Sequence, residues 1–426
     1  MMRSTRAPGS RSNRKSNRGV LSRCRICGCQ TLEKFLSLGP SPLANNFLTA
    51  EQLRRPEPYF PLDVCFCTTC WLVQLADVVP PEAMFTEYLY LTGASQPMRL
   101  HFAGLAADLV ERFSPPRGGL IVDIGSNDGT FLEQAQAHGL RGLGVEPAAN
   151  VVAVAQARGV ETLNAFFNAE VAERIVREKG PAKAVVATNV FAHVHDLDGF
   201  VASMVRLLAE DGVFVIEVPY VVDMLDRLEF DTIYHEHLSY FGVRPLTLLF
   251  ERFGLQVTHV SLLKVHGGSI RVYVQRSPGP PPSRAVSELV AKETAEGFGT
   301  SDTYQRFAQR VQTLKDELAG LLGQLKTQGA RIVGYGAPAK GNTLLNFCKV
   351  GPDLLEYLVD TTPFKQGRFS PGMHIPVFPE ERFHNEPPDY ALILAWNYAE
   401  EILEKETVFR HQGGKFIIPI PRPTLV

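Results

Sequence analysis

The sequence predicts an α/β protein of three domains: a small zinc-binding domain at the N-terminus, a Rossmann-like core and a second Rossmann-like domain at the C-terminus. Three observations predict this class. Expected strands and helices alternate between residues 120 and 275, as in a doubly wound parallel sheet. A second alternating unit begins at Arg331. Six of the seven cysteines lie between Cys24 and Cys70, which sets the N-terminal part apart from the rest.

Domain boundaries are expected where the composition changes. Residues 1–22 form a basic tail, rich in Ser and Arg and without acidic residues, which we expect to be disordered. Residues 23–85 form the zinc-binding domain and residues 86–280 the core. The Pro-rich stretch 276–284 is a linker, and residues 284–426 form the C-terminal domain.

Hydrophobic patterning predicts the elements in order. Residues 24–80 are expected to be rich in loops, and residues 88–111 to be helical. Strands of the core are short apolar runs, expected at 120–124, 142–145, 184–188, 213–218, 256–262 and 270–274. Helices are expected between them at 151–158, 170–178 and 197–208, followed by one long amphipathic helix over 286–328. Strands of the C-terminal domain are expected at 332–334, 355–359, 390–395 and 415–419.

Composition and charge exclude several classes of protein. The chain is 45% hydrophobic and 21% charged, as expected of a globular enzyme, and its net charge of −2 indicates neither nucleic acid nor an anionic membrane as a partner. No apolar run approaches the roughly 18 residues of a membrane helix. The basic tail lacks the apolar segment of a secretory signal; its alternative role is an arm that binds nucleic acid or a partner. We expect a cytoplasmic monomer.

The cysteines form two pairs with metal-ligand spacing. Cys24 and Cys27 form one C-x-x-C pair, and Cys67 and Cys70 form the other. Two such knuckles supply the four thiolates of a closed, structural zinc site, so we expect one zinc ion per chain and no catalytic role for it. Cys29 and Cys65 lie beside the pairs and would serve as zinc ligands in another register. The alternatives to a zinc site are buried free thiols or a redox pair. A cytosolic disulfide framework is not expected.

A cofactor loop follows the first strand of the core. Residues 120–131 read LIVDIGSNDGTF, in which the strand ends in Asp123 and the turn contains Gly125, Ser126, Asn127 and Gly129. Glycine allows the sharp turn and close approach to a ligand. The loop lacks the G-x-G-x-x-G pattern of dinucleotide sites and is typical of S-adenosylmethionine binding, except that Asn127 replaces a glycine. Asn tolerates the left-handed conformation that the turn requires.

Other candidate cofactor residues end the neighbouring strands. Glu146 ends the second strand, where an acid accepts hydrogen bonds from ribose hydroxyls; the same placement also suits NAD. Phe167, with Phe166, follows the third strand and would flank the adenine, although both would also fit a hydrophobic core. Asn189 ends the fourth strand, which places it and the nearby His193 at the carboxyl edge of the sheet.

The densest reactive segment is YHEHLSY at residues 234–240. It brings Tyr234, Glu236 and His237 together, and so offers an acid, a base and hydrogen-bond donors just after the fifth strand. A single histidine is more often a satisfied core or surface residue, but this density favours a reactive site. Together with Cys24–Cys70, DIGSNDGTFL, NVFAHVHDL, VHGGSIRV and YGAPAKGNTLLN, the segment resembles the sugar C-methyltransferases of deoxysugar biosynthesis, such as the tetronitrose and mycarose C-3 enzymes.

The resemblance covers the chain from Cys24 to the C-terminus and implies a function. Members of this family methylate a carbon of a nucleotide-linked 4-keto-deoxysugar, usually a dTDP sugar, with S-adenosylmethionine as donor. The residues that match their catalytic site are Tyr88, His193, Tyr234, Glu236 and His237. A carbon next to a ketone needs a base to remove its proton and donors for the enolate oxygen. We expect His237 to be the base, with Glu236 as the second choice.

The C-terminal domain is expected to hold the sugar nucleotide. Residues 332–341 read IVGYGAPAKG, which partly matches a dinucleotide loop, and Asp360 ends the next strand, so a NAD-dependent sugar oxidoreductase is the rival hypothesis. Pro338 and Lys340 suit a diphosphate at least as well. The candidate substrate-binding residues are Tyr90, His266, Gly336, Lys340, Asn342 and Lys365. The third hypothesis is a non-catalytic zinc scaffold with a vestigial methyltransferase fold. The intact 234–240 segment argues against it.

Overall fold

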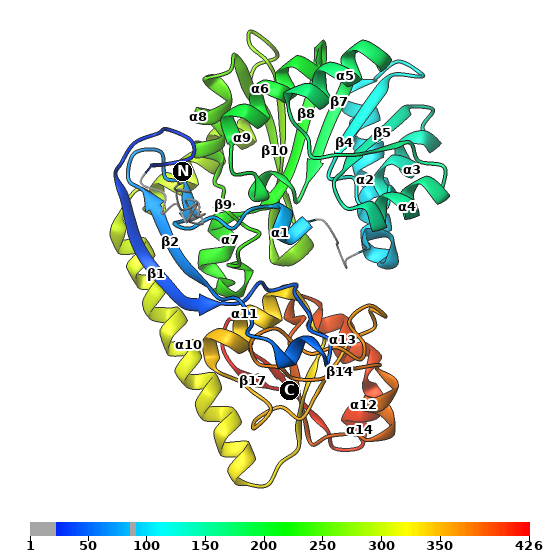
Figure 1. Cartoon of the computed structure of the whole chain (residues 1–426). Coiled ribbons are helices and arrows are strands. Elements are labelled where there is room, and N and C mark those ends of the chain that lie inside the picture. Colours follow the sequence, from blue (N-terminus) through cyan, green and yellow to red (C-terminus); the bar gives the residue numbers. More distant parts are fainter. Residues whose placement is uncertain (1–22, 86–90) are drawn as a thin grey trace, which may run out of the picture.

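The computed structural model describes residues 23–85 and 91–426, and within them the side chains of Ala94 and His266 are not described. Three separate sheets, two of them largely parallel and accompanied by helices, confirm the predicted α/β class (Figure 1). The core domain and the C-terminal domain form two lobes, and the strands of the zinc-binding domain run along one side of both. The basic tail of residues 1–22 lies outside the described residues.

The zinc-binding domain contains a four-stranded antiparallel sheet in the order β1–β2–β3–β9. Its strands are β1 (Leu32–Ser41), β2 (Phe60–Cys67), β3 (Val73–Leu75) and β9 (Ser239–Tyr240). The sequence analysis named no strand here, because register shifts within the β1–β2 pair disturb the alternation that a strand shows in sequence. The fourth strand belongs to the 234–240 segment, so the reactive segment and the zinc-binding domain share one sheet.

The core is a seven-stranded sheet in the order β10–β11–β8–β7–β4–β5–β6. Its strands are β4 (Leu120–Ile124), β5 (Arg141–Glu146), β6 (Thr162–Asn164), β7 (Ala182–Thr188), β8 (Leu208–Pro219), β10 (Leu255–Leu263) and β11 (Ser269–Arg276). The first five are mutually parallel. β11 pairs antiparallel with both of its neighbours, β8 and β10. The parallel strands end at one edge, which is where such sheets bind ligands.

Helices cover both faces of the core sheet (Figure 1). They are α2 (Gln96–Phe113), α3 (Thr130–Ala137), α4 (Ala149–Ala157), α5 (Ala169–Lys179), α6 (Leu197–Leu207), α7 (Val221–Asp226) and α8 (Val243–Glu251). Two short elements matter for the site, α1 (Glu82–Phe85) and the 3-10 turn η4 (Phe230–Thr232), because both lie next to the cavity described below.

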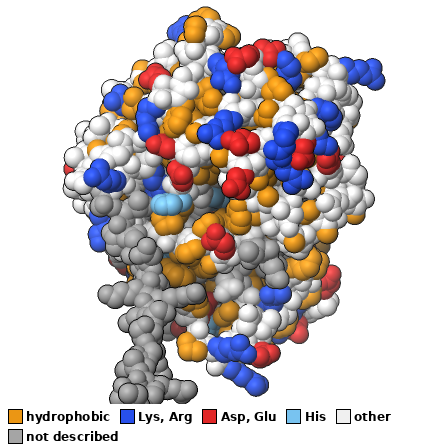
Figure 2. Space-filling view, turned by 45° about the horizontal axis from the view of Figure 1, so that its top comes forward, with side chains coloured by type: hydrophobic (Ala, Val, Ile, Leu, Met, Phe, Trp, Pro, Cys, Tyr) orange, Lys and Arg blue, Asp and Glu red, His pale blue; other side chains and the backbone are white. Residues whose placement is uncertain are grey.

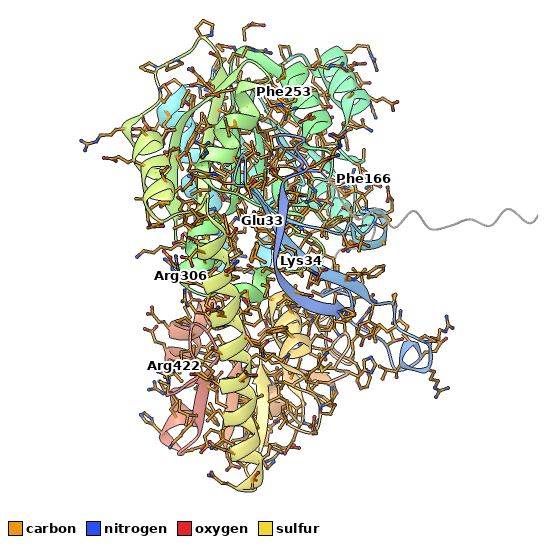
Figure 3. All side chains as sticks on the ribbon, turned by 90° about the vertical axis from the view of Figure 1, so that its left-hand side faces the viewer. Glu33, Lys34, Phe166, Phe253, Arg306 and Arg422 are labelled. Atoms are coloured by element: carbon orange, nitrogen blue, oxygen red, sulfur yellow. The ribbon has the colours of Figure 1, made fainter. Side chains whose placement is uncertain are left out.

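The expected single helix over 286–328 is two helices, α9 (Arg284–Ala295) and α10 (Ser301–Thr327). The break falls at Gly297, whose φ of 75° does not continue a helix. Figure 3 shows α10 running past the zinc-binding domain and along the C-terminal domain, with Arg306 in its first part and Arg422 of the C-terminal domain farther along it. Tyr304 of α10 stacks on Phe66 with ring centroids 4.2 Å apart, and Arg422 forms an ion pair with Glu317.

The C-terminal domain is a six-stranded sheet in the order β14–β13–β12–β15–β16–β17. Its strands are β12 (Ile332–Tyr335), β13 (Leu358–Val359), β14 (Val377–Phe378), β15 (Tyr390–Ile393), β16 (Lys415–Ile418) and β17 (Thr424–Leu425). All pair in parallel except β17. Its helices are α11 (Ala339–Cys348), α12 (Glu381–Asn385), α13 (Ala399–Lys405) and α14 (Thr407–His411).

The surface carries charges of both signs. On the face shown in Figure 2, basic and acidic side chains are interspersed over the upper part of the molecule rather than gathered by sign. Among the described residues, no helix combines the length and the apolar composition needed to cross a membrane.

Candidate active site

One large cavity, of about 840 Å³, lies between the core and the C-terminal domain. Side chains of all three domains line it. The zinc-binding domain contributes Asn45, Pro81 and Phe85. The core contributes, among others, the loops after β4, β5, β6 and β7, and the C-terminal domain contributes the loops after β12, β13 and β15. The carboxyl edges of two parallel sheets therefore face one space, as expected of a ligand site in α/β proteins.

The glycine-containing loop after β4 approaches this cavity closely. Gly125 has φ 69°, and a Cβ there would lie 2.3 Å from Val190 Cγ2, so only glycine fits. Asn127 has φ 48°, the left-handed conformation that its short side chain tolerates. Its backbone N–H donates to Glu146 Oε2 at 3.0 Å, which ties the loop to the end of β5.

Two buried oxygen atoms of this loop have no partner within the described structure. They are Oδ1 of Asp123 and Oγ of Ser126, and both residues line the cavity. Burial, together with the negative charges of Glu146 and Glu217, raises the pKa of Asp123 well above its usual range. A buried carboxyl with an unused acceptor fits a ligand that brings hydrogen-bond donors or positive charge.

Glu146 is buried at the cavity and uses both carboxylate oxygens. Oε2 accepts from Asn127 N and Oε1 accepts from Ala148 N at 2.9 Å. Each oxygen keeps a second lone pair, so the carboxylate can still accept from two hydroxyl groups. Burial raises the pKa of Glu146, and the two backbone donors oppose that shift.

The other cofactor candidates also border the cavity, with the exception of Gly129. Phe167 packs edge-on against Phe200, with ring centroids 5.2 Å apart. Phe166 is 38% exposed and is labelled near the surface in Figure 3. Asn189 lines the cavity with φ 55°. Gly129 lies behind the loop, where its φ of 79° and the nearby Val160 allow no larger residue.

Four stacked or tilted rings also line the cavity. Phe85, His193 and His237 stack in that order, with centroids 5.3 and 5.1 Å apart, and Tyr234 lies 4.1 Å from His237 on its other side. Nδ1 of His237 lies 2.7 Å from the carbonyl oxygen of Thr232. Because a carbonyl only accepts, Nδ1 carries the proton, and the neutral ring has its lone pair on Nε2.

His193 is held in the neutral form. Burial, reinforced by the nearby His237, lowers the pKa of His193 well below its usual value. Its Nε2 is buried and has no hydrogen-bond partner among the described residues. A neutral imidazole with an unused ring nitrogen at a cavity can donate a hydrogen bond to a ligand oxygen.

Glu236 is buried and does not border the cavity. Burial raises its pKa to about 7, and a hydrogen bond from Asn45 Nδ2 to Oε1, 2.7 Å long, opposes the shift. The carboxylate therefore faces the zinc-binding domain, and Asn45 stands between it and the cavity.

Lys340 forms the opposite wall of the cavity, in the C-terminal domain. Its Nζ lies 4.1 Å from the ring centroid of Trp396, and the described structure contains no ion pair or hydrogen bond to it. Burial lowers the pKa of Lys340, while Asp231 and Glu229 oppose the shift. Trp396 in turn donates from Nε1 to Asp231 Oδ2 at 2.7 Å. Asp231 of η4, in the core, therefore fixes the Trp396 ring that Lys340 contacts.

The remaining substrate candidates are spread over several places. Lys365 lines the cavity and donates to the carbonyl oxygen of Ala337 at 2.9 Å. Gly336 and Asn342 do not line it: Gly336 has φ 85° and lies against Ala395, and Asn342 is buried with Nδ2 bonded to Ala44 O. Tyr88, Tyr90 and the side chain of His266 lie outside the described part of the structure.

The four predicted zinc ligands converge. The sulfur atoms of Cys24, Cys27, Cys67 and Cys70 lie within 4.8 Å of one another, which suits a tetrahedral four-thiolate shell. Arg25, between the first two ligands, donates to the carbonyl oxygen of Leu238 at 2.8 Å. The knuckle is therefore bonded directly to the reactive segment of the core.

Comparison with known proteins assigns the family. Three family models match: a zinc-binding domain over residues 24–85, a methyltransferase domain over 98–260 and a C-methyltransferase C-terminal domain over 264–421. The chain is 40% identical to the C-methyltransferase NovU of Streptomyces niveus, an alignment of 407 residues that covers 95% of this chain and 97% of that protein. This chain belongs to the C-methyltransferase family.

Solved structures also match part of the methyltransferase. One is the magnesium protoporphyrin IX methyltransferase of Synechocystis PCC 6803 with bound SAM, at 14% identity and a TM-score of 0.32, covering 42% of this chain and 79% of that chain. Another is a Haloferax volcanii complex of the Trm112 methyltransferase activator with a methyltransferase, at 16% identity and a TM-score of 0.35, covering 44% and 95%.

The methyltransferase depends on S-adenosylmethionine and on a four-cysteine zinc site, as the sequence predicted. The residues present fit both groups. The unused buried oxygens of Asp123 and Ser126 and the close backbone approach at Gly125 suit the donor, and the converging thiolates suit zinc.

Sequence reasoning missed three residues of this site. Asn45 belongs to no motif and lies in a domain predicted to be structural. Asp231 acts through a contact with another domain, which no local pattern reveals. Trp396 could have been found, because it follows β15 at the carboxyl edge of a parallel sheet.

Proposed function

We propose that the methyltransferase adds a methyl group to C-3, the carbon next to the ketone, of a dTDP-4-keto-deoxysugar in the biosynthesis of natural-product glycosides. The observation that carries this proposal is the arrangement of the cavity. The stacked His193 and His237 form one part of its lining, the donor loop forms a second, and the half-buried Lys340 forms a third. One space thus combines a base, a methyl-donor site and a site for an anion.

His237 is the base in this proposal. Its Nδ1–H donates to Thr232 O, which fixes the ring and directs the lone pair of Nε2 away from that bond. A neutral imidazole has a pKa near 6.5 in the absence of perturbation, so it can accept the proton from the carbon next to the ketone near pH 7.

His193 and Tyr234 stabilise the enolate that results. His193 stays neutral because of its burial, and an N–H on its unpartnered Nε2 can donate to the developing oxyanion. Tyr234 lies against His237 and borders the cavity, where its hydroxyl can serve as a second donor.

Bound S-adenosylmethionine supplies an electrophilic methyl group on a sulfonium. On the protein side, Asp123 offers its unused oxygen to the donor, Glu146 has lone pairs for two ribose hydroxyls, and Phe167 and Asn189 border the same space. The protein would then need only to hold the nucleophilic sugar carbon opposite the sulfur, in line with the methyl–sulfur bond, because positioning alone can supply much of the barrier reduction.

The nucleotide end of the substrate belongs at Lys340. The Lys340 ammonium is half-buried at the cavity and has no ion pair among the described residues, so the phosphates of a sugar nucleotide can pair with it. Lys365 also lines the cavity, where its Nζ lies 3.6 Å from Asp360 Oδ2. Asp360, the residue that would bind a ribose in a NAD enzyme, accepts from Ala337 N and Thr362 N, which gives it a role within its own loop.

Lys340→Ala is expected to raise the KM for the sugar nucleotide by about 10- to 100-fold, because hydrogen bonds to charged groups contribute about 1.5–3 kcal/mol. The KM for S-adenosylmethionine should stay unchanged. Steady-state kinetics with each substrate varied in turn measures both values. Lys415→Ala, which changes an exposed lysine of the same domain, is the control. An unchanged KM for the sugar nucleotide would place the diphosphate elsewhere.

The function itself is tested by a substrate screen. Purified enzyme is incubated with S-adenosylmethionine carrying a deuterated methyl group and with a panel of dTDP-4-keto-deoxysugars that differ in their substituents at C-3. Mass spectrometry should show the labelled methyl group on a sugar product, and NMR should place it at C-3. If no keto sugar of the panel gains the label while donor binding is intact, the proposed substrate class is wrong.

A further inference from the structure

Asn45 is the one polar residue of the zinc-binding domain that lines the active-site cavity among the described residues; Pro81 and Phe85 are its other contributions. Asn45 lies between β1 and β2 in sequence, in a stretch that crosses toward the C-terminal domain. Its neighbour Asn46 is exposed, whereas Asn45 is half-buried with its side chain at the cavity. No residue in the zinc-binding sheet, by contrast, borders that space among those described.

The orientation of the Asn45 amide follows from its partner. Nδ2 lies 2.7 Å from Glu236 Oε1. An ionised carboxylate only accepts hydrogen bonds, so the nitrogen of the amide must face it and the oxygen must face the other way. Among the described residues, Oδ1 of Asn45 has no hydrogen-bond partner, and it is not sealed from solvent as the buried orphan atoms are.

Backbone contacts on both sides fix the segment that carries Asn45. The carbonyl oxygen of Ala44 accepts from Asn342 Nδ2 of α11 at 2.7 Å. Leu48 exchanges backbone hydrogen bonds with Phe369, 2.9 and 2.8 Å long. The backbone that carries Asn45 therefore cannot shift away from Glu236 without breaking contacts with the C-terminal domain.

We infer that Asn45 is a further active-site residue, whose amide N–H positions the Glu236 carboxylate and whose amide oxygen accepts a hydrogen bond from a hydroxyl of the sugar. This inference rests on the proposed function, because it takes the cavity ligand to be a sugar. Glu236 itself does not border the cavity, so Asn45 relays its orientation to the substrate.

The chemistry of the pair supports this role. Burial raises the pKa of Glu236 to about 7, and the donated hydrogen bond favours its charged form. In return the carboxylate holds the amide rigidly, since a hydrogen bond to a charged group is shorter and stronger than a neutral one. A rigid acceptor at a cavity is what orients one ring hydroxyl relative to a base.

Asn45→Ala tests the inference. We expect kcat for the sugar nucleotide to fall between about tenfold and a hundredfold, the effect of removing a hydrogen bond to a charged group. The calorimetric affinity for S-adenosylmethionine, the zinc content and the melting temperature should match the wild type. Asn46→Ala, the exposed neighbour of the same type, should keep full kcat.

Two further variants make the test decisive. Asn45→Asp keeps the size of the side chain but replaces the donor with an acceptor, so it should lose at least as much kcat as Asn45→Ala even if the alanine variant folds poorly. Because Glu236 acts on the substrate through Asn45, the double variant Asn45→Ala/Glu236→Gln should lose less than the product of the two single losses.

The outcomes separate this inference from the proposed function. An active wild type together with an unaffected Asn45→Ala variant, or multiplicative losses in the double variant, would overturn the role of Asn45 alone. If Asn45→Ala also lowers the melting temperature and weakens donor binding by a factor similar to its loss of kcat, Asn45 is a structural residue. A wild type inactive on every keto sugar would overturn the proposed function and this inference with it.

Discussion

Replacing His237 by alanine should lower kcat by about 10²–10⁴-fold, the usual contribution of a general base, while the affinity for S-adenosylmethionine stays unchanged. The ring is fixed by the bond from Nδ1 to Thr232 O and borders the cavity, so its loss removes the proton acceptor and little else. Single-turnover kinetics at saturating substrate measures the chemical step, and calorimetry measures donor binding.

The variant His237→Asn sharpens this test. The amide nitrogen of Asn can replace Nδ1 as donor to Thr232 O, but nothing replaces Nε2, so kcat should stay as low as in His237→Ala. His138→Ala, which changes an exposed histidine outside the cavity, serves as the control.

Proton removal can also be observed without methylation. With S-adenosylhomocysteine bound, the wild type is incubated with substrate in deuterated water, under conditions in which it shows measurable exchange at C-3. His237→Ala should then show none. If it exchanges as fast as the wild type, another group is the base, and Glu236 becomes the first candidate, since burial raises its pKa to about 7.

Removing the zinc should destabilise the whole protein and inactivate it. Structural zinc contributes roughly 10–16 kcal/mol of binding free energy in zinc-finger peptides, and that energy is folding energy. Cys67 and Cys70 are fully buried, and the sheet that follows them pairs β3 with β9 of the reactive segment. We expect a fall in the melting temperature and faster amide exchange over residues 232–240, measured by mass spectrometry after treatment with a chelator.

Substitutions provide the matched comparison for the zinc prediction. Cys67→Ala should lose the metal, as measured by elemental analysis, and show the same two changes. Cys65→Ala, which removes a buried thiol of the same strand outside the four-sulfur cluster, should keep one zinc per chain. Full metal content in a variant that lacks all four ligands, or zinc loss without any change in exchange, would contradict the prediction.

Local patterns were enough to predict the fold class, the zinc ligands and the donor loop. Each depends on neighbours in sequence: paired C-x-x-C knuckles, and a strand that ends in Asp123 before a glycine turn. The strands of the zinc-binding domain were missed because their register shifts hide the alternation, and the long helix was overextended because Gly297 interrupts a continuous amphipathic pattern.

The candidate site could be predicted only in part, for a physical reason. His193 and His237 stand out by composition, but their stacking, the neutral form of His193 and the tautomer of His237 depend on burial and on contacts over distance. The Asp231–Trp396 and Asn45–Glu236 bonds each join two domains, so no window of sequence contains both partners.

The long helix α10 has a consequence for anyone who would recombine enzymes of this family. Its Tyr304 packs on the zinc-binding sheet, while the Nζ of Lys315, at the middle of the helix, lies 4.5 Å from the ring centroid of Phe347 in α11. A chimera that exchanges only residues after the linker would therefore pair a foreign helix with the native zinc-binding sheet. Exchanges meant to alter sugar preference should keep α10 and the β1–β2 sheet from one parent, and place the crossover after Gly329, where the helix has ended.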